Sequence, residues 1–305
     1  MFVLHPDPYL LPSYGISPFT TDNISRNHKL PDDDSIDDYF TERFKGKHYQ
    51  YTLNGRESIN IALSHYHLQK DDIVTILTTT GNFYISGCVT REIEKFCKWS
   101  RQIEPRTKVI LVNHEFGYPY KDLLTLNNTG LPVIEDCAHS FFSKDENNTI
   151  GTVGDFAIYS FPKMFPLQIG GFLVNNKHCE LPESSLLEDE KHYIKNVLSY
   201  YIKSEREIIK ERLINYTYLS QEFRKVGFVE HIKLVDGIVP GVFMFRKERG
   251  HISMPELKKH FYAHGIQCSV FYGEEAFFIP VHQALMEHDL TYFCEVLKSF
   301  IIYNF

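Results

Sequence analysis

Lys163 is the residue whose setting first suggests chemistry. It is the one charged side chain in FAIYSFPKMFPLQIGG, residues 156–171, a segment made mostly of aromatic, aliphatic, proline and glycine residues. An amine is a nucleophile only when it has lost its proton, and apolar surroundings that disfavour the ammonium ion lower its pKa. Lys163 is therefore a candidate nucleophile, unless its four-carbon stem only covers apolar surface.

An acidic residue supplies the second half of such a site. The segment LPVIEDCAHS, residues 131–140, has the pattern of a buried strand that ends in Glu135 and Asp136. An aspartate at a strand end can pair with a pyridinium nitrogen, which keeps the ring protonated and makes it an electron sink. Asp136 and Lys163 together indicate a pyridoxal phosphate (PLP) enzyme. On these two features alone, a surface lysine and a turn or helix-capping aspartate are the alternative interpretation.

The elements that must position these residues follow a βαβ pattern. The predicted helices are RESINIALSHYHL, which begins beside Gly55, and VTREIEKFCKWSRQI; the predicted strands are DIVTILTT, VILV, LPVIEDC, FAIYSF and GGFLVNN. This alternation predicts an α/β fold with a mainly parallel central sheet flanked by helices. The ligand site of such a sheet lies beyond the carboxyl ends of its strands, where Asp136, His139 and Lys163 are expected.

The chain divides into three predicted parts. Residues 1–45, rich in Pro, Asp, Ser and Tyr, are typical of an N-terminal arm with a short helix. Residues 46–190 are expected to form a large PLP-binding α/β domain. Residues 191–305 begin with a charged, strongly helical connector and continue as a small C-terminal α+β domain.

Composition narrows the class of protein. With 305 residues, 43% of them hydrophobic, the chain can fill a large core. A net charge of -7 and the lack of a dense basic run argue against a nucleic-acid partner. No stretch approaches about 18 uninterrupted apolar residues, so we expect a cytoplasmic protein without membrane insertion. The cysteines form no CxxC pair, so we expect reduced thiols and no metal site; they are Cys88, Cys97, Cys137, Cys179, Cys268 and Cys294.

Several segments together resemble one family. VIEDCAHS, GTVGDFAIYSF and KMFPLQIGG are similar to the acidic strand end, the Gly-Asp turn with its strand, and the lysine followed by a Gly-Gly pair of the DegT/DnrJ/StrS-type sugar aminotransferases. TLNGRESINIAL, RTKVILVNHEFGYP and MPELKKHFYAHGIQ resemble further segments of that family. The resemblance extends from about residue 45 to 300. It implies the fold of a fold-type I PLP-transferase.

The resemblance also implies roles for four residues around the cofactor ring. Lys163 would bind PLP through its amine and move a proton between the substrate and the cofactor. Asp136 would bind the pyridine nitrogen, and Ser160 would reach the phosphate. His139 would lie near the 3-hydroxyl of the ring; the alternative is a core histidine satisfied by a backbone carbonyl.

Four more residues are implied at the phosphate end and over the ring. Backbone amides of Arg56 and Glu57, after Gly55, would hold the phosphate at a helix N-terminus, whose partial positive charge favours an anion. The Arg56 side chain either pairs with the phosphate or points to solvent. Tyr84 stands where the family has an aromatic residue stacked on the ring; the alternative is an aromatic residue on a buried helix face.

The implied function is transfer of an amino group from an amino-acid donor, with glutamate as the expected donor, to a nucleotide-linked keto sugar, in surface-polysaccharide or related sugar biosynthesis. The implied assembly is a homodimer. Two departures keep alternatives open: the stretch after Tyr84 is short, and no G-x-N-x-R loop, by which a neighbouring subunit contacts the phosphate, is found between residues 175 and 215. The alternatives are another PLP reaction on a smaller substrate and a non-catalytic binding or scaffold protein. Lys163 argues against the dehydrating members, which have histidine at that position.

Overall fold

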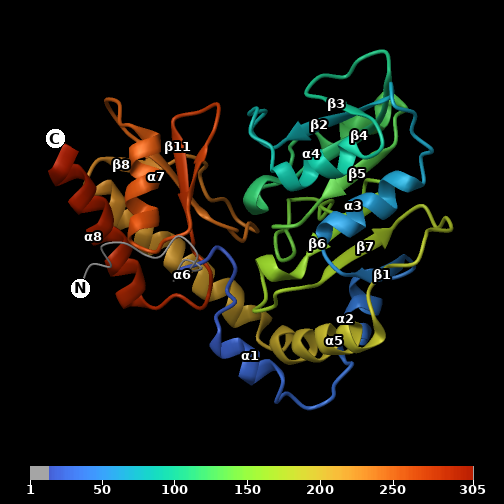
Figure 1. The fold of residues 1–305 in the computed structure, drawn as a ribbon, viewed down its shortest axis with the longest axis horizontal. Coiled ribbons are helices and arrows are strands. Elements are labelled where there is room, and N and C mark those ends of the chain that lie inside the picture. Colours follow the sequence, from blue (N-terminus) through green and yellow to red (C-terminus); the bar gives the residue numbers. More distant parts are fainter. Residues whose placement is uncertain (1–13, 305) are drawn as a thin grey trace.

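The computed structural model describes residues 14–304, so the first thirteen residues of the expected N-terminal arm lie outside the described part of the chain. The described residues contain two sheets, a large one at the right of Figure 1 and a small one at its left. The division into segments 1–45, 46–190 and 191–305 stays a prediction.

The large sheet has seven strands in the order β1-β7-β6-β5-β4-β2-β3. The strands are β1 (His48–Thr52), β2 (Ile73–Thr78), β3 (Lys98–Ser100), β4 (Thr107–Asn113), β5 (Val133–Asp136), β6 (Phe156–Ser160) and β7 (Gly171–Asn175). The pairs from β3 to β6 are parallel, whereas β7 runs antiparallel to β6 and β1 antiparallel to β7. The predicted mainly parallel α/β fold is therefore confirmed.

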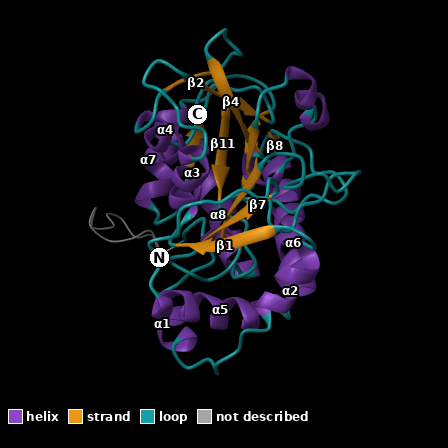
Figure 2. Cartoon of the chain, turned by 90° about the vertical axis from the view of Figure 1, so that its right-hand side faces the viewer, coloured by secondary structure: helices purple, strands orange, loops and turns teal. Residues whose placement is uncertain are grey.

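Helices cover both faces of this sheet. On one face lie α3 (Gly55–Ser64) and α4 (Gly87–Glu94), and on the other α2 (Ile36–Arg43) and α5 (Glu188–Ile202). Residues that alternate along β6 supply both cores, because neighbouring side chains of a strand point to opposite faces: Ile158 packs with α3 and Tyr159 packs with α2. Figure 2 shows α1 (Asp22–Asn27), α2 and α5 together at one end of the molecule, below β1 and β7.

The small sheet is antiparallel, in the order β10-β11-β9-β8. Its strands are β8 (Phe228–Glu230), β9 (Phe243–Lys247), β10 (Ser269–Phe271) and β11 (Ala276–Ile279), packed with helices α6 (Glu205–Arg224), α7 (Met254–Ala263) and α8 (Glu287–Asn304). In Figure 1 α6 follows α5 and runs into this small unit. Among the helices in the described part of the chain, none is long and apolar enough to cross a membrane.

Two local predictions differ from the structure. VTREIEKFCKWSRQI, predicted as one helix, is a helix only to Glu94, and β3 follows at Lys98–Ser100. Pairing with β2 overrides the helical pattern, because β3 satisfies backbone groups of β2 that a continued helix would leave unpaired. In the expected N-terminal arm, residues 22–43 form two short helices instead of one, α1 and α2.

Candidate functional site

Seven of the eight residues predicted for the site line one cavity of about 460 Å³. The cavity lies at the carboxyl ends of β4, β5 and β6, beside the start of α3, and Phe278 of the small sheet closes it from the other side. The predicted residues in its wall are Gly55, Arg56, Tyr84, Asp136, His139, Ser160 and Lys163. Glu57 is the one that does not line it.

Asp136 is a buried carboxylate that forms no ion pair with any of residues 14–304. It ends β5 with 6% of its surface exposed. Its Oδ1 accepts a hydrogen bond from the Ala138 amide at 3.1 Å and its Oδ2 from Asn113 Nδ2 at 2.9 Å. Burial raises the pKa of Asp136, although these donors and the charges of His114 and Lys163 oppose the shift. A carboxylate that is buried with neutral donors only is suited to a bound cation such as a pyridinium N–H.

Glu135, the neighbour of Asp136, has a structural role instead. Its fully buried carboxylate accepts hydrogen bonds from the amides of Gly151, Val153 and Gly154 at 2.7 to 2.9 Å, and it lies 3.0 Å from His114 Nε2. Glu135 therefore fixes the turn before β6. The alternation of a strand separates the two acids, because Glu135 points to this turn and Asp136 to the cavity.

Lys163 lies at the end of a single 3₁₀ turn, Phe161–Lys163, directly after β6. The turn is packed on both sides by the fully buried rings of Phe161 and Phe165. The Lys163 side chain is half-buried and lines the cavity. Desolvation lowers the pKa of Lys163, while Cys88 and Asp136 act in the opposite direction. More of its amine is therefore unprotonated at neutral pH than in an exposed lysine, as the sequence setting predicted.

Sequence reasoning missed Arg212, which holds the Lys163 turn from behind. The side chain is fully buried in α6, and Nη2 donates to the Lys163 carbonyl at 2.9 Å. Nη1 donates to the Pro240 carbonyl at 3.1 Å and Nε to Gln283 Oε1 at 2.8 Å. Gln283 in turn donates to the Met164 carbonyl at 2.8 Å. These bonds fix two successive carbonyls of the turn that carries the amine.

Replacing Arg212 by Met is expected to lower the free energy of unfolding by about 3 kcal/mol, because it leaves buried carbonyl oxygens without donors, each at a cost of about 1 to 3 kcal/mol. Urea unfolding followed by circular dichroism measures the change. Arg206→Met is the matched control: this arginine is on the same helix but exposed, and we expect a change within about 0.5 kcal/mol. Equal stabilities of the two variants would contradict the role given to Arg212.

The imidazole ring of His139 has a buried nitrogen without a hydrogen-bond partner among the described residues. Its Nδ1 is buried without a hydrogen-bond partner, and a Cβ placed on Gly241 would lie 2.5 Å from that nitrogen. Burial lowers its pKa well below the usual value, and the charges of Lys163 and Arg212 act in the same direction. The ring is therefore neutral. Within residues 14–304, no backbone carbonyl accepts a hydrogen bond from His139, so the alternative of a core histidine satisfied in this way is not observed.

The start of α3 has the geometry expected for a phosphate site, with one exception. Gly55 packs against Ser160, its Cβ position 3.5 Å from the Ser160 Cβ, and Arg56 is exposed at the cavity. The Glu57 amide, however, donates to Asn54 Oδ1 at 3.1 Å, and the Glu57 carboxylate accepts from the amides of Leu53 and Ser185 at 2.6 Å. These bonds cap the helix. The part of Glu57 in phosphate binding stays a prediction.

Gly171 allows the strand that follows the Lys163 turn to approach this helix start. A Cβ at Gly171 would lie 2.4 Å from the Asn54 carbonyl carbon, so the backbone would have to shift. We expect Gly171→Ala to lower the unfolding free energy by about 1 to 3 kcal/mol and to weaken PLP binding, measured by fluorescence titration. Gly87→Ala is the control, because no atom comes closer than 4.0 Å to its Cβ position. Similar behaviour of both variants would contradict the close approach.

Tyr84 lies in the loop before α4, so the alternative of a buried helix face is wrong. Its ring is stacked with that of Tyr272 in the small sheet unit, with 6.2 Å between the ring centroids and 17° between the ring planes. The centroid of the Phe278 ring lies 6.3 Å from that of Tyr84. Burial raises its pKa. Tyr84 therefore forms the wall where the two sheet units meet over the cavity; stacking on a cofactor ring stays a prediction.

The residues present fit PLP. A buried carboxylate, a lysine with lowered pKa and the ring of His139 line one cavity with a helix N-terminus at its edge. These are the positions at which the sequence resemblance expects the ring nitrogen, the aldehyde, the ring oxygen and the phosphate.

Comparison with known proteins gives consistent results. Residues 96–180 match the model of the DegT/DnrJ/EryC1/StrS aminotransferase family. A putative L-glutamine:3-amino-2,3-dideoxy-scyllo-inosose aminotransferase of Micromonospora echinospora is 30% identical over 154 residues, 44% of this chain and 37% of that protein. GDP-perosamine synthase of Vibrio cholerae is 25% identical over 191 residues, 55% of this chain and 52% of that protein. The matched part thus spans about half or less of these relatives.

Solved structures extend the likeness of fold to nearly the whole chain. The aminotransferase TlmJ of Streptoalloteichus hindustanus has a TM-score of 0.72 at 16% identity, with 92% of this chain and 94% of that chain covered. An aminotransferase of the same family from Brucella abortus has a TM-score of 0.70 at 14% identity, with 92% and 93% covered. The predicted fold and the resemblance to the DegT/DnrJ/EryC1/StrS aminotransferases are confirmed.

Proposed function

We propose that this chain, as a DegT/DnrJ/EryC1/StrS aminotransferase, uses PLP to transfer an amino group from an amino acid to a nucleotide-linked keto sugar. The observation that carries the proposal is the pair of Asp136 and Lys163 in one cavity: a buried carboxylate without a cation and an amine whose pKa burial lowers. A packing role explains neither, because an unpaired buried charge costs stability.

PLP, when bound, supplies a carbonyl group that condenses with amines and a ring that accepts electrons. The residues of this chain do the rest. Asp136, held by Asn113 and the Ala138 amide, would keep the nitrogen of the bound ring protonated. The lowered pKa of Lys163 leaves its amine able to take a proton from the substrate carbon and return it. The carbonyl of Lys163, fixed by Arg212, keeps that amine directed into the cavity.

The remaining residues would orient the cofactor and hold its phosphate. A neutral His139 would interact with an oxygen of the cofactor without adding charge. The start of α3, Ser160 and the exposed guanidinium of Arg56 form an anion-binding edge for the phosphate. Tyr84 and Phe278 shield the reacting atoms from water on the side of the small sheet.

The sugar substrate is proposed from the relatives. A GDP-perosamine synthase and an aminotransferase of an inosose are proteins whose names place an amino group on a sugar or cyclitol. Glutamate as donor, a place in surface-polysaccharide or related sugar biosynthesis, a cytoplasmic location and a homodimer complete the proposal. Light scattering on the purified protein tests the dimer.

The absorption spectrum of the purified protein with PLP tests cofactor and reaction together. We expect a band of lysine-bound PLP that glutamate bleaches, with 2-oxoglutarate formed in the same amount. A band with no 2-oxoglutarate from glutamate, and no corresponding keto acid from other amino acids, would favour another PLP reaction on a smaller substrate. Absence of any band would refute the proposal and leave a non-catalytic binding protein.

A further inference from the structure

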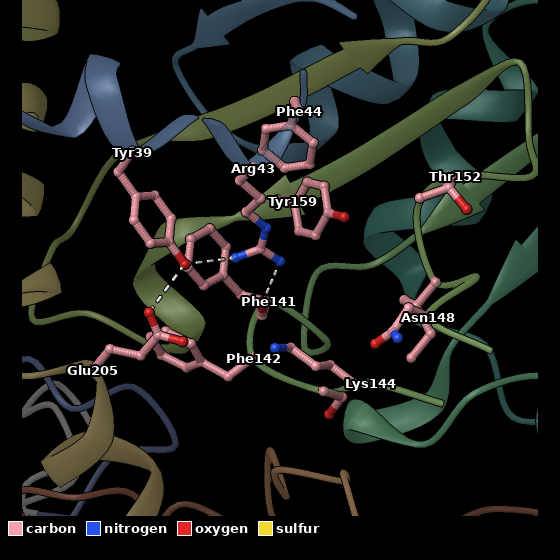
Figure 3. A pocket seen from close by; sticks show the side chains of 12 residues that line it. Tyr39, Arg43, Phe44, Phe141, Phe142, Lys144, Asn148, Thr152, Tyr159 and Glu205 are labelled. Atoms are coloured by element: carbon pink, nitrogen blue, oxygen red, sulfur yellow. Dashed lines mark hydrogen bonds between the residues drawn. The ribbon is translucent and has the colours of Figure 1, made fainter. Parts of the chain in front are cut away.

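A second cavity, of about 230 Å³, lies across the large sheet from the Lys163 cavity. Tyr159 lines it, while Ile158 and Ser160 on either side of Tyr159 line the first cavity, so the two open on opposite faces of β6. Its walls come from α2, from the loop of residues 141–152 and from the start of α6 (Figure 3). Nothing in the proposed reaction uses it.

Arg43 is the central cation of this cavity. Its Cζ lies 4.2 Å from the ring centroid of Phe141, 5.2 Å from that of Phe44 and 5.6 Å from that of Tyr159. Aromatic rings contact the flat face of a guanidinium and leave the N–H groups at its edge directed elsewhere. The rings therefore hold Arg43 in one orientation without using its donors.

Most of those donors lack a protein partner. Nη1 donates to the Tyr39 hydroxyl at 3.2 Å and Nη2 to the Phe141 carbonyl. A guanidinium has five N–H groups, so three remain without an acceptor in residues 14–304. A side chain that served only to pack against these rings would not require a cavity at its donor edge.

The charges around Arg43 favour an anion. No carboxylate of the described residues forms an ion pair with Arg43 or with Lys144, an exposed lysine of the same lining. Glu205 is the carboxylate in this lining, and it accepts a hydrogen bond from Tyr39 at 3.2 Å. Figure 3 shows the ends of the Arg43 and Lys144 side chains directed toward the same part of the pocket, near the Phe141 carbonyl.

We propose that this pocket binds a small oxyanion, the carboxylate or phosphate group of a metabolite, on the edge of Arg43 with Lys144 at the rim. Planar N–H pairs match such oxygens, and the aromatic rings that hold Arg43 in place reduce the entropy cost of binding. The bound group contacts the segments that carry His139 and Ser160, since Phe141 and Tyr159 belong to them. It therefore stabilises the Lys163 cavity from the opposite face of the sheet.

Calorimetric titration of the full chain at low ionic strength, with inorganic phosphate and separately with acetate, tests the site. The two probes distinguish a phosphate from a carboxylate ligand. We expect a saturable site for at least one probe that is absent in Arg43→Gln and binds about tenfold more weakly in Lys144→Gln, because a charge-assisted hydrogen bond is removed. Any phosphate bound in the Lys163 cavity is counted separately, as binding that Arg43→Gln retains and Arg56→Gln weakens. Arg56→Gln is the matched control for phosphate bound in the Lys163 cavity, and it should retain binding at the second site.

Three outcomes would overturn the proposal: no saturable binding of either probe to the unchanged protein, as many anions bound by Arg43→Gln as by the unchanged protein, or binding lost in Arg56→Gln alone. Thermal melts of each variant check the fold. If Arg43→Gln does not fold, Lys144→Gln decides the matter, because Lys144 is exposed and its loss leaves the core intact. The test does not require cofactor or activity, so it stands apart from the proposed aminotransferase reaction.

Discussion

Lys163→Ala abolishes transamination while the protein stays folded: this is the largest effect we expect. Activity should fall by about 10⁴-fold or more, because one residue binds the cofactor aldehyde and moves the proton. The fold should survive, since the fixed contacts of Lys163 are made by its backbone carbonyl, which alanine keeps. Turnover of glutamate to 2-oxoglutarate measures the loss, and circular dichroism confirms the fold.

Chemical trapping identifies the lysine directly. Borohydride should attach PLP irreversibly to the peptide that contains Lys163, and mass spectrometry should find no such peptide in Lys163→Ala. Lys121→Ala, at an exposed lysine outside the cavity lining, is the control and should be trapped like the unchanged protein. PLP fixed on another lysine, or unchanged turnover in Lys163→Ala, would contradict the assignment.

Asp136→Asn gives the second largest effect. We expect activity to fall by about 10³-fold, since an amide does not hold a proton on the ring nitrogen. The cofactor-free variant should be at least as stable as the unchanged protein near neutral pH. The folded-state pKa of Asp136 is raised, so its ionised form opposes folding; stability from this group is full below its unfolded pKa and is lost as pH rises through the folded pKa. The Asp136→Asn variant has no ionisable group at this position, so it does not lose this stability as the pH rises.

Glu135→Gln is the neighbouring control for Asp136→Asn. Because Glu135 accepts hydrogen bonds from three backbone amides and contacts His114, we expect this variant to be less stable. Thermal unfolding of both cofactor-free variants at pH 7 makes the comparison. A large loss of stability in Asp136→Asn, or no loss in Glu135→Gln, would contradict the division of roles between the two acids.

The parts of the site that lie in short, contiguous segments could be predicted from the sequence. The strand end at Asp136 and the turn at Lys163 each lie in a run of about ten residues whose apolar pattern and neighbours are local, and both meet at one sheet edge because parallel strands end together. The glycine-led helix start at Gly55 is local in the same way. Pattern and resemblance therefore sufficed to predict the residues that meet in the candidate cofactor site.

Contacts between distant segments could not be predicted in this way. Arg212 is one of several charged residues in EREIIKERLINYTYLSQEFR, and nothing in that pattern distinguishes it from exposed Arg206. Its burial depends on acceptors 49 and 71 residues away along the chain. The strand at Lys98–Ser100 depends in the same way on β2, which pairs with it. Propensity is a weak signal where tertiary contacts decide.

Arg212 also has a mechanical consequence. α6 packs into the core of the small sheet through Tyr216 and Leu219, yet its arginine holds the carbonyl of Lys163 at the edge of the large one. A rotation of the small sheet unit must either break buried hydrogen bonds or take the turn with it. The turn that carries the Lys163 amine is thus coupled to the small unit through Arg212, and a movement of that unit would also move the amine.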